Sequence, residues 1–294
     1  MLKNILVLLI SCGLFGTALM PWENSILRRE NQAGLLPEET LAGGDALNQQ
    51  MAMISLGGLR SLVAAFLSLE AFESFRQGDW HGVERRYKQI VTLAPHTAFY
   101  WDTGAWHLAY NAASSFLRDD HDHLPMSEKR RLYREYIDKG KNFLRKGAAT
   151  NPDDWLVQSR LGNILSDTKR YPDFQQAADA YARAKELGAP SIVSRQQFYS
   201  LARIPGKAKE AWELGKELYK NPDNRLPSMA TTLFALQNRL NIPEKDRIPF
   251  RELFPSDKLA RVSFINQLSN GLGYPTDGIR EALDALPPAP EKKK

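Results

Sequence analysis

Residues 77–95 read QGDWHGVERRYKQIVTLAP. A Gly-Asp-aromatic turn opens this stretch, a polar segment of helix length follows, and Pro95 closes it. Because glycine marks turns and proline cannot continue a helix, the stretch predicts one helix with defined ends. A short polar helix bounded in this way is typical of one half of a repeated helical hairpin.

The segment before this helix supplies the other half of the hairpin. Hairpin repeats of about 34 residues place large and small side chains at fixed positions, because two helices must nest closely and then stack on the next pair. A first repeat over 64–97 has Gly-Asp-Trp at 78–80, between its two helices, and Tyr87 at an aromatic position. Leu67 occupies the position that Trp101 takes in the next repeat, about 34 residues later.

The second repeat keeps these features but is interrupted. It runs from Trp101 to Pro152 and is broken by RDDHDHLPMSEK, residues 118–129. After the interruption, Gly140 and Gly147 stand where small residues are required. The second helix of this repeat is therefore expected after residue 129.

Later repeats are progressively less regular. The third joins Leu161 and Gly162 to an A-x3-Y-x2-A pattern at residues 177–184, and a weaker fourth covers 191–224. Residues 226–285 keep helical periodicity but lose the repeat positions. This loss is expected for the last hairpin, because the end of a repeat array needs a cap.

Over roughly 64–224 the chain resembles the tetratricopeptide-repeat (TPR) family, on the positions just given. The block from Ser55 to Asn111 also resembles a little-characterised group of bacterial envelope proteins that join an N-terminal apolar segment to such repeats. The resemblance implies an all-α fold: an α-solenoid of TPR-like helical hairpins preceded by an N-terminal signal or anchor helix. An irregular helical bundle is the alternative, because several repeat positions fit imperfectly.

The pattern divides the chain into five segments. Polar residues with Gly and Pro indicate a linker after the N-terminus, and the C-terminal LPPAPEKKK cannot bury apolar surface. The segments are a signal peptide or membrane anchor at 1–21, a linker at 22–44, TPR-like repeats at 45–225, capping hairpins at 226–285 and a disordered tail at 286–294.

The composition is that of a globular protein without disulfides. Of the 294 residues, 43% are hydrophobic and 25% are charged, an ordinary globular range. The formal net charge of +5 is spread along the chain, which fits an anionic membrane surface or an acidic partner but does not indicate nucleic-acid binding. Cys12 is the only cysteine, so neither an intrachain disulfide nor a thiolate zinc site can form.

The N-terminus predicts export. Lys3 precedes an apolar stretch from Ile5 to Met20, slightly shorter than the roughly 17 residues that a spanning helix needs. Three interpretations stay open: an uncleaved anchor, a signal peptide with a small-x-small cleavage site at 16–18, and lipidation at Cys12. Each places the rest of the chain in the bacterial envelope, either anchored in the inner membrane and facing the periplasm or secreted to the periplasm.

Residues 51–69 are a second apolar segment. The helical pattern begins at Asp45, contains Gly57-Gly58, and has Arg60 near the centre of the segment, where lipid would make a charge costly. We therefore expect a core helix or a helix on a membrane surface, in preference to a second spanning helix. A glycine pair destabilises a helix by roughly 2 kcal/mol relative to alanine, so a break or a close helix contact is expected there.

In TPR proteins the first helix of each hairpin lines a concave groove that holds an extended or helical peptide, and the resemblance carries this role to matching positions. Aromatic and arginine side chains dominate interface energies, and arginine can bind a carboxylate through two hydrogen bonds. The alternative is that Phe72, Trp106 and Tyr199 form the core between repeats. The predicted groove residues are Phe72, Phe75, Arg76, Asp102, Trp106, Tyr110, Asn163, Asp167, Arg195, Tyr199 and Arg203.

No catalytic or metal-binding motif stands out. The run DDHDH at 119–123 holds metal-binding residue types, but a charged loop without a third ordered ligand is more often solvated. His81, His96 and His107 are isolated and are expected at turns or on helix surfaces. Residues 166–169 match the S-x-x-K of penicillin-recognising enzymes but lack the companion K-T-G. We therefore predict no metal, no cofactor and no enzymatic activity.

Together these features predict an exported, membrane-tethered TPR scaffold that grips a partner protein or peptide in an envelope assembly. Two other functions stay open. One is a glycan- or cell-wall-acting enzyme with paired carboxylates in the groove. The other is an accessory of secretion or transport that embeds residues 51–69 in the membrane.

Overall fold

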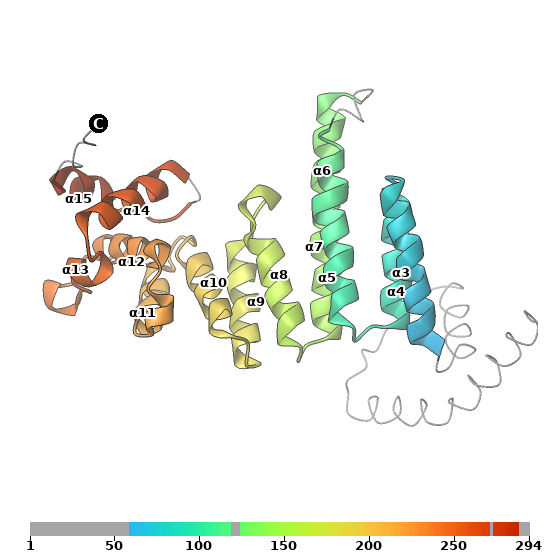
Figure 1. Cartoon of the computed structure of the whole chain (residues 1–294), viewed down its shortest axis with the longest axis horizontal. Coiled ribbons are helices and arrows are strands. Elements are labelled where there is room, and N and C mark those ends of the chain that lie inside the picture. The colour runs from blue at the N-terminus through green and yellow to red at the C-terminus, as the bar shows by residue number, and fades with distance from the viewer. Residues whose placement is uncertain (1–58, 119–123, 271–272, 288–294) are drawn as a thin grey trace, which may run out of the picture. The chain divides into compact units, whose positions relative to one another are not determined.

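The computed structural model describes residues 59–118, 124–270 and 273–287 (Figure 1). Within these ranges the chain is helical and has no strand, which confirms the predicted all-α class. Among the helices so described, none combines the length and the hydropathy needed to cross a membrane. The predicted signal or anchor at 1–21, the linker at 22–44 and the DDHDH run lie outside the described residues.

The described residues divide into two compact units, one up to Pro152 and the other from Asp153 onward. The boundary follows Pro152, the proline at which the repeat pattern ends its second hairpin. Each predicted repeat therefore falls within one unit and is divided by no boundary.

The first unit consists of two packed pairs of helices. α3 packs along α4, while α5 and the π-helix that continues it, η2, pack along α7; α5 also contacts α4. The elements are α3 (Arg60–Arg76), α4 (Trp80–Leu93), α5 (Ala98–Trp106), η2 (His107–Ala112), α6 (Ala113–Ser115) and α7 (Met126–Thr150).

The turn that opens residues 77–95 has a specific geometry. Gly78 has φ of +72°, a left-handed conformation that glycine adopts without steric cost. Asp79 follows as the N-cap of α4, and its carboxylate accepts a hydrogen bond of 2.9 Å from the backbone N–H of Gly82. The Gly-Asp pair therefore both reverses the chain after α3 and starts α4.

A hydrogen-bonded junction fixes the entry to α5. The carbonyl oxygen of Pro95 accepts a hydrogen bond of 2.7 Å from the indole Nε1 of Trp101 and one of 3.0 Å from the side-chain amide of Asn151. Asn151 is the C-cap of α7 and is buried, so this contact joins the end of the first hairpin to the end of the second. Trp101 therefore connects the two hairpins through its hydrogen bond to Pro95.

Glycines allow these helices to approach closely. A Cβ atom at Gly147 would lie 2.7 Å from the ring of Trp101, and one at Gly162 would lie 2.5 Å from the ring of Tyr181. Both distances are shorter than real carbon contacts, so a larger residue at either position would force the facing ring to shift. The predicted pairing of small with bulky side chains is therefore present within hairpins of both units.

The second unit is a succession of packed helices. Each helix from α8 to α12 contacts the next along the chain, α12 also contacts α13 and α14, and α14 contacts α15. The elements are α8 (Trp155–Ser166), η4 (Thr168–Arg170), α9 (Phe174–Glu186), α10 (Ser191–Leu201), α11 (Ala208–Tyr219), η5 (Pro222–Asn224), α12 (Pro227–Arg239), η6 (Glu244–Asp246), α13 (Phe250–Leu253), α14 (Asp257–Asn270) and α15 (Ile279–Ala285).

The C-terminal segment is larger than a single degenerate hairpin. Helices α12 to α15 surround a cluster of phenylalanine rings, in which Phe254 and Phe264 are fully buried and meet edge to face with their centroids 4.9 Å apart. The same core includes Phe198 of α10 and Trp212 of α11. The segment therefore closes the second unit by sharing its core.

Gly162→Ala tests the close approach within the third hairpin. Alanine is intrinsically better than glycine in a helix by about 1 kcal/mol, yet we expect the variant to be less stable by about 1–3 kcal/mol, because its methyl group would overlap the Tyr181 ring. The Tyr181 hydroxyl donates to Asn163 Oδ1 at 2.9 Å, which hinders the ring from moving aside. Chemical denaturation measures the difference.

The control for this substitution is Lys185→Ala on the exposed side of α9, which should change stability by less than about 0.5 kcal/mol. A Gly162→Ala chain as stable as the native one would show that helix propensity outweighs the contact and that the close approach is not required.

Candidate functional site

The predicted groove residues fall into two groups. Phe72, Phe75 and Arg76 lie on α3 of the first unit, with Asp102, Trp106 and Tyr110 on α5 and η2. The remaining residues lie in the second unit and are Asn163, Asp167, Arg195, Tyr199 and Arg203. Each group is described within its own unit.

In the first unit, aromatic side chains from two separate helices meet. The ring of Phe75 lies 6.2 Å from that of Phe72 and 4.8 Å from the imidazole of His107. Trp106 lies 5.1 Å from the same imidazole. Phe72 is 58% exposed and Trp106 is 48% exposed, so these four residues, here called the aromatic surface, present two large apolar side chains to solvent.

His107 forms the floor of the aromatic surface, and the expectation that it lies at a turn or on a helix surface is wrong. It is only 8% exposed, and its ring also lies 5.6 Å from that of Tyr87. Burial lowers the pKa of His107 to about 4, so the imidazole is neutral at pH 7 and packs as one more aromatic ring.

A change in helix type accompanies this placement. His107 begins the π-helix η2, and its Nδ1 lies 3.1 Å from the side-chain amide nitrogen of Asn111. π-Helical turns occur mostly as insertions in α-helices and are frequent at functional sites. No local motif marks this turn, although the apolar neighbours of His107 in the run WHLAY are a sequence signal for burial.

Other predicted residues surround the aromatic surface less directly. Arg76 is held by an ion pair with Glu73 at 2.9 Å, while Asp102 and Tyr110 are partly buried. Phe99, which the repeat positions do not include, is 66% exposed and precedes Trp106 by two turns on the same side of α5. Exposed aromatic area on α5 therefore extends beyond the predicted residues.

The second unit covers two of its predicted groove residues with its own chain. The guanidinium carbon of Arg203 lies 3.7 Å from the ring centroid of Tyr274 and 4.9 Å from that of Phe174. Burial is the largest influence on Arg203 and lowers the pKa of its guanidinium. Tyr199 is buried against Tyr274, with ring centroids 5.9 Å apart, and its hydroxyl lies 2.7 Å from Ser228 Oγ. Tyr199 is therefore part of the core, which was the alternative to a place in the groove.

Hydrogen bonds within the unit engage the other three residues. Arg195 donates to Asn224 Oδ1 at 2.6 Å, and Asn163 Oδ1 accepts from the Tyr181 hydroxyl. The carboxylate of Asp167 accepts from the backbone N–H of Lys169 at 2.8 Å, in the turn between α8 and α9. These side chains therefore stabilise turns and helix contacts in the second unit.

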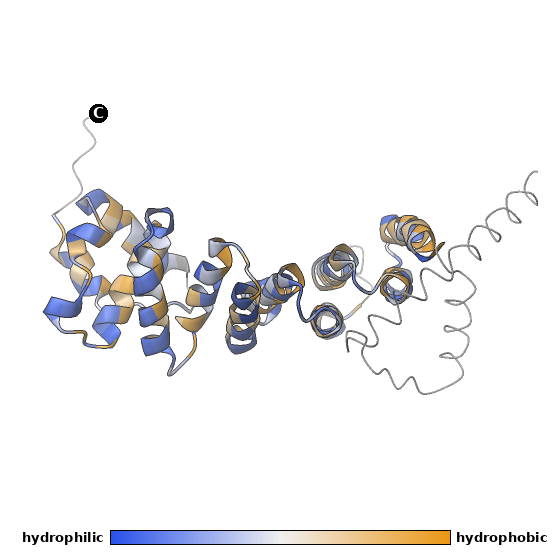
Figure 2. Cartoon of the chain, turned by 90° about the horizontal axis from the view of Figure 1, so that it is seen from below, coloured by the Kyte–Doolittle hydropathy of each residue, from blue (hydrophilic) through white to orange (hydrophobic). Residues whose placement is uncertain are grey.

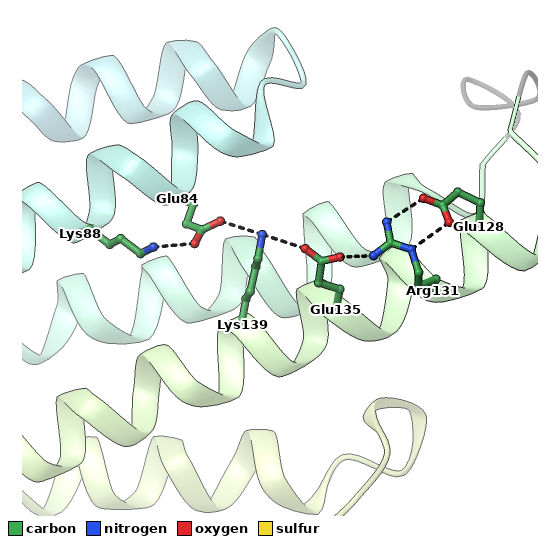
Figure 3. A network of polar contacts seen from close by, with 6 residues as sticks. All are labelled: Glu84, Lys88, Glu128, Arg131, Glu135 and Lys139. Atoms are coloured by element: carbon green, nitrogen blue, oxygen red, sulfur yellow. Dashed lines mark hydrogen bonds and ion pairs between the residues drawn. The ribbon is translucent and has the colours of Figure 1, made fainter.

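A polar pocket of about 530 Å³ lies away from the predicted groove residues, between α4 and α7. Glu84 is one of its lining residues and pairs with Lys88 at 2.7 Å and with Lys139 at 3.1 Å (Figure 3). Burial alone would raise the pKa of Glu84, but hydrogen bonds from the two lysines outweigh it and the pKa is lowered. The contacts drawn in Figure 3 join Glu84, Lys88, Glu128, Arg131, Glu135 and Lys139.

This network has a structural role. Glu84 belongs to α4 and Lys139 to α7, so their ion pair links the two hairpins of the first unit. The Glu84 carboxylate already pairs with Lys88 and Lys139, which opposes anion binding by these two lysines. The pocket therefore offers a less distinct site than the aromatic surface does.

Metal ligation finds no support in the described ranges, which hold no group of three or more His, Cys, Asp or Glu residues placed to bind an ion. Ser166, the serine of the S-x-x-K match, lies with its hydroxyl 3.0 Å from that of Tyr181.

Protein-family models and curated proteins provide no match to the chain. The aromatic surface is accordingly the candidate site on physical grounds.

The buried imidazole predicts a pH dependence of stability. A pKa of about 4 in the folded chain and about 6.5 in the unfolded chain means that the unfolded chain binds more protons between these values. Stability from this group is fully present above pH 6.5 and declines as the pH falls towards 4. Between pH 7.5 and pH 5 we expect the native chain to lose about 2 kcal/mol more than His107→Phe, as measured by denaturant unfolding.

The substitution retains a ring and removes the titration, and it leaves His81 and His96 in place in both proteins. Equal losses of stability in the two chains over this pH range would show that His107 is not desolvated.

Proposed function

We propose that this protein is an exported, membrane-tethered scaffold of TPR-like hairpins that binds a partner protein or peptide in the bacterial envelope. The observation that carries the proposal is the aromatic surface of Phe72, Phe75 and Trp106 over a buried, neutral His107. It lies on the first helices of the two hairpins in its unit, the positions that bind ligands in TPR proteins.

The composition and exposure of this surface favour binding. Tryptophan and tyrosine are enriched among residues that dominate interface energies, and a large aromatic ring left about half exposed retains apolar area that a partner can bury. The underlying rings are held by contacts within the unit, so little conformational freedom is lost on association.

The nature of the surface favours a protein or peptide over a small polar ligand. Phe72 and Phe99 extend the exposed aromatic area along α3 and α5, whereas the pocket near Glu84 is lined by charged and polar side chains. A chain of amino acids with apolar side chains could contact both helices. The second unit, where Tyr274 covers Arg203, would then support the array rather than the ligand.

The repeat packing and the N-terminal sequence support the rest of the proposal. Gly147 against Trp101 and Gly162 against Tyr181 are the small-on-large contacts expected when TPR hairpins nest. Residues 5–20 provide an apolar run that fits an export signal or anchor. An anchor would hold the aromatic surface close to envelope proteins and raise their effective concentration.

Site-directed crosslinking in cells tests the proposal. With a photo-reactive phenylalanine analogue in place of Trp106, the full chain should form a discrete adduct with one envelope protein. After that protein is identified and purified, Trp106→Ala should bind it at least about 30-fold more weakly, because an aromatic residue at the centre of an interface contributes about 2 kcal/mol or more.

Ile265 on α14 provides the matched control, since its 46% exposure is close to the 48% of Trp106. Crosslinker at position 265 should give no discrete adduct, and Ile265→Ala should bind normally. Absence of an adduct from position 106, or equal adducts from the two positions, would contradict the assignment of the aromatic surface.

A further inference from the structure

The side of α3 that faces away from α4 carries large apolar residues in solvent. Leu62 is 52% exposed, Phe66 is 60% exposed and Leu69 is 66% exposed, and their spacings of four and three place them on one side of the helix. We call these three residues the outer face of α3. The opposite side buries Ala64 and Ala71. Figure 2 colours the helices by hydropathy, with orange for hydrophobic residues.

As far as Leu69 this side of α3 lacks the charged side chains of an ordinary surface helix, and they return at Glu73 and Arg76, the next positions at the same spacing. Residues 61–69 carry no charge, and the first acidic residue, Glu70, pairs with Arg86 of α4 at 2.8 Å. Glu73 and Arg76 form their own ion pair in the last turns. An apolar side of this length is therefore expected to be covered by something other than water.

A second copy of the chain does not suit the outer face. Three side chains that are half to two-thirds exposed offer on the order of 350 Å². Stable protein interfaces bury about 800 Å² on each partner. The outer face alone falls well below this area.

The residues that precede α3 in the chain are also an unsuitable cover for its outer face. α3 begins without a side-chain cap, since Leu59 stands at the N-cap with helical backbone angles and Arg60 follows in the first turn. In the sequence, Leu47, Met51 and Ile54 repeat the spacings of four and three upstream, and Gly58 stands midway between Ile54 and Leu62. This spacing predicts that the upstream segment adds to the same apolar side, which favours extension of that side over its coverage.

The position of α3 in the chain favours a lipid surface. It is the first described helix after the apolar run at 5–20. If the predicted linker over residues 22–44 is flexible, its average span is roughly 26 Å, close to the thickness of the hydrocarbon core of a bilayer. A helix joined to a membrane anchor by such a linker would stay within reach of the membrane surface.

We propose that the outer face of α3 lies in the interfacial layer of a lipid bilayer, with Leu62, Phe66 and Leu69 among the acyl chains. The proposal rests on the membrane tether of the proposed function. Leucine and phenylalanine are the residues that bury the apolar side of an interfacial helix. Because Arg60 and Arg76 are balanced by Glu70 and Glu73 on the same helix, the contact depends on apolar area and not on anionic lipid.

Fluorescence quenching in vesicles tests this arrangement. In the full chain with Cys12→Ala, Leu69→Cys is labelled with bimane and reconstituted into phosphatidylcholine vesicles. We expect a blue-shifted emission, at least threefold stronger quenching by nitroxide-labelled lipid and at least threefold weaker quenching by iodide than for bimane at Arg85→Cys, an exposed position on α4. Lipid quenching at position 69 should persist at high salt.

Three results would overturn the proposal. Equal iodide quenching at the two positions places the outer face in water. Protection of position 69 from both quenchers shows a protein cover, either upstream residues or a second copy. If quenching requires anionic lipid, the contact depends on charge and not on the apolar area of the outer face.

A second variant separates loss of lipid contact from loss of folding. Phe66→Glu should reduce lipid quenching at position 69 at least threefold while circular dichroism shows unchanged helix content, because Phe66 is 60% exposed and lies outside the buried core. Unchanged lipid quenching in this variant contradicts the proposal. Crosslinking from position 106 is an independent readout, so either proposal can fail while the other stands.

Discussion

The architecture of the first unit depends on helix backbones that lie directly against aromatic rings. At Gly104 a Cβ atom would lie 2.7 Å from Phe143 of α7 and 3.0 Å from Tyr87 of α4, so α5 fits between these two helices only with glycine at this position. Trp106 and His107 follow within one turn. The depth at which α5 sits therefore decides how His107 is buried and how far Trp106 reaches into solvent.

The two units use their aromatic residues in different ways. In the first, Phe72 and Trp106 remain about half exposed over a neutral imidazole. In the second, Tyr274 packs on Arg203 and Tyr199, and the polar atoms of neighbouring side chains bond within the unit. Among the predicted groove residues, the first unit therefore leaves two large aromatic side chains in solvent, whereas the second unit covers its own with Tyr274.

Much of the fold was predictable because its signals are local. Gly78 and Asp79 predict a turn and a helix start, and Gly162 with Tyr181 predicts a close helix contact, from residue type and spacing alone. The burial of His107 was not predictable in this way, since it depends on rings contributed by α3 and α4. The contact that covers Arg203 could not be predicted either, because Tyr274 is distant in sequence and lies at no repeat position. The groove role of Trp106 stays a prediction.

The placement of Tyr274 has a consequence for stoichiometry. A repeat array with equivalent hairpins could hold several ligands or one long ligand, but Arg203 and Tyr199 are already occupied by the chain's own aromatic ring. If the aromatic surface binds a protein ligand as proposed, each molecule would hold one such ligand at these positions, because Tyr274 covers the equivalent residues of the second unit. Two molecules of the protein would then be needed to connect two such ligands. The extent of any larger assembly would depend on the local concentration of the protein.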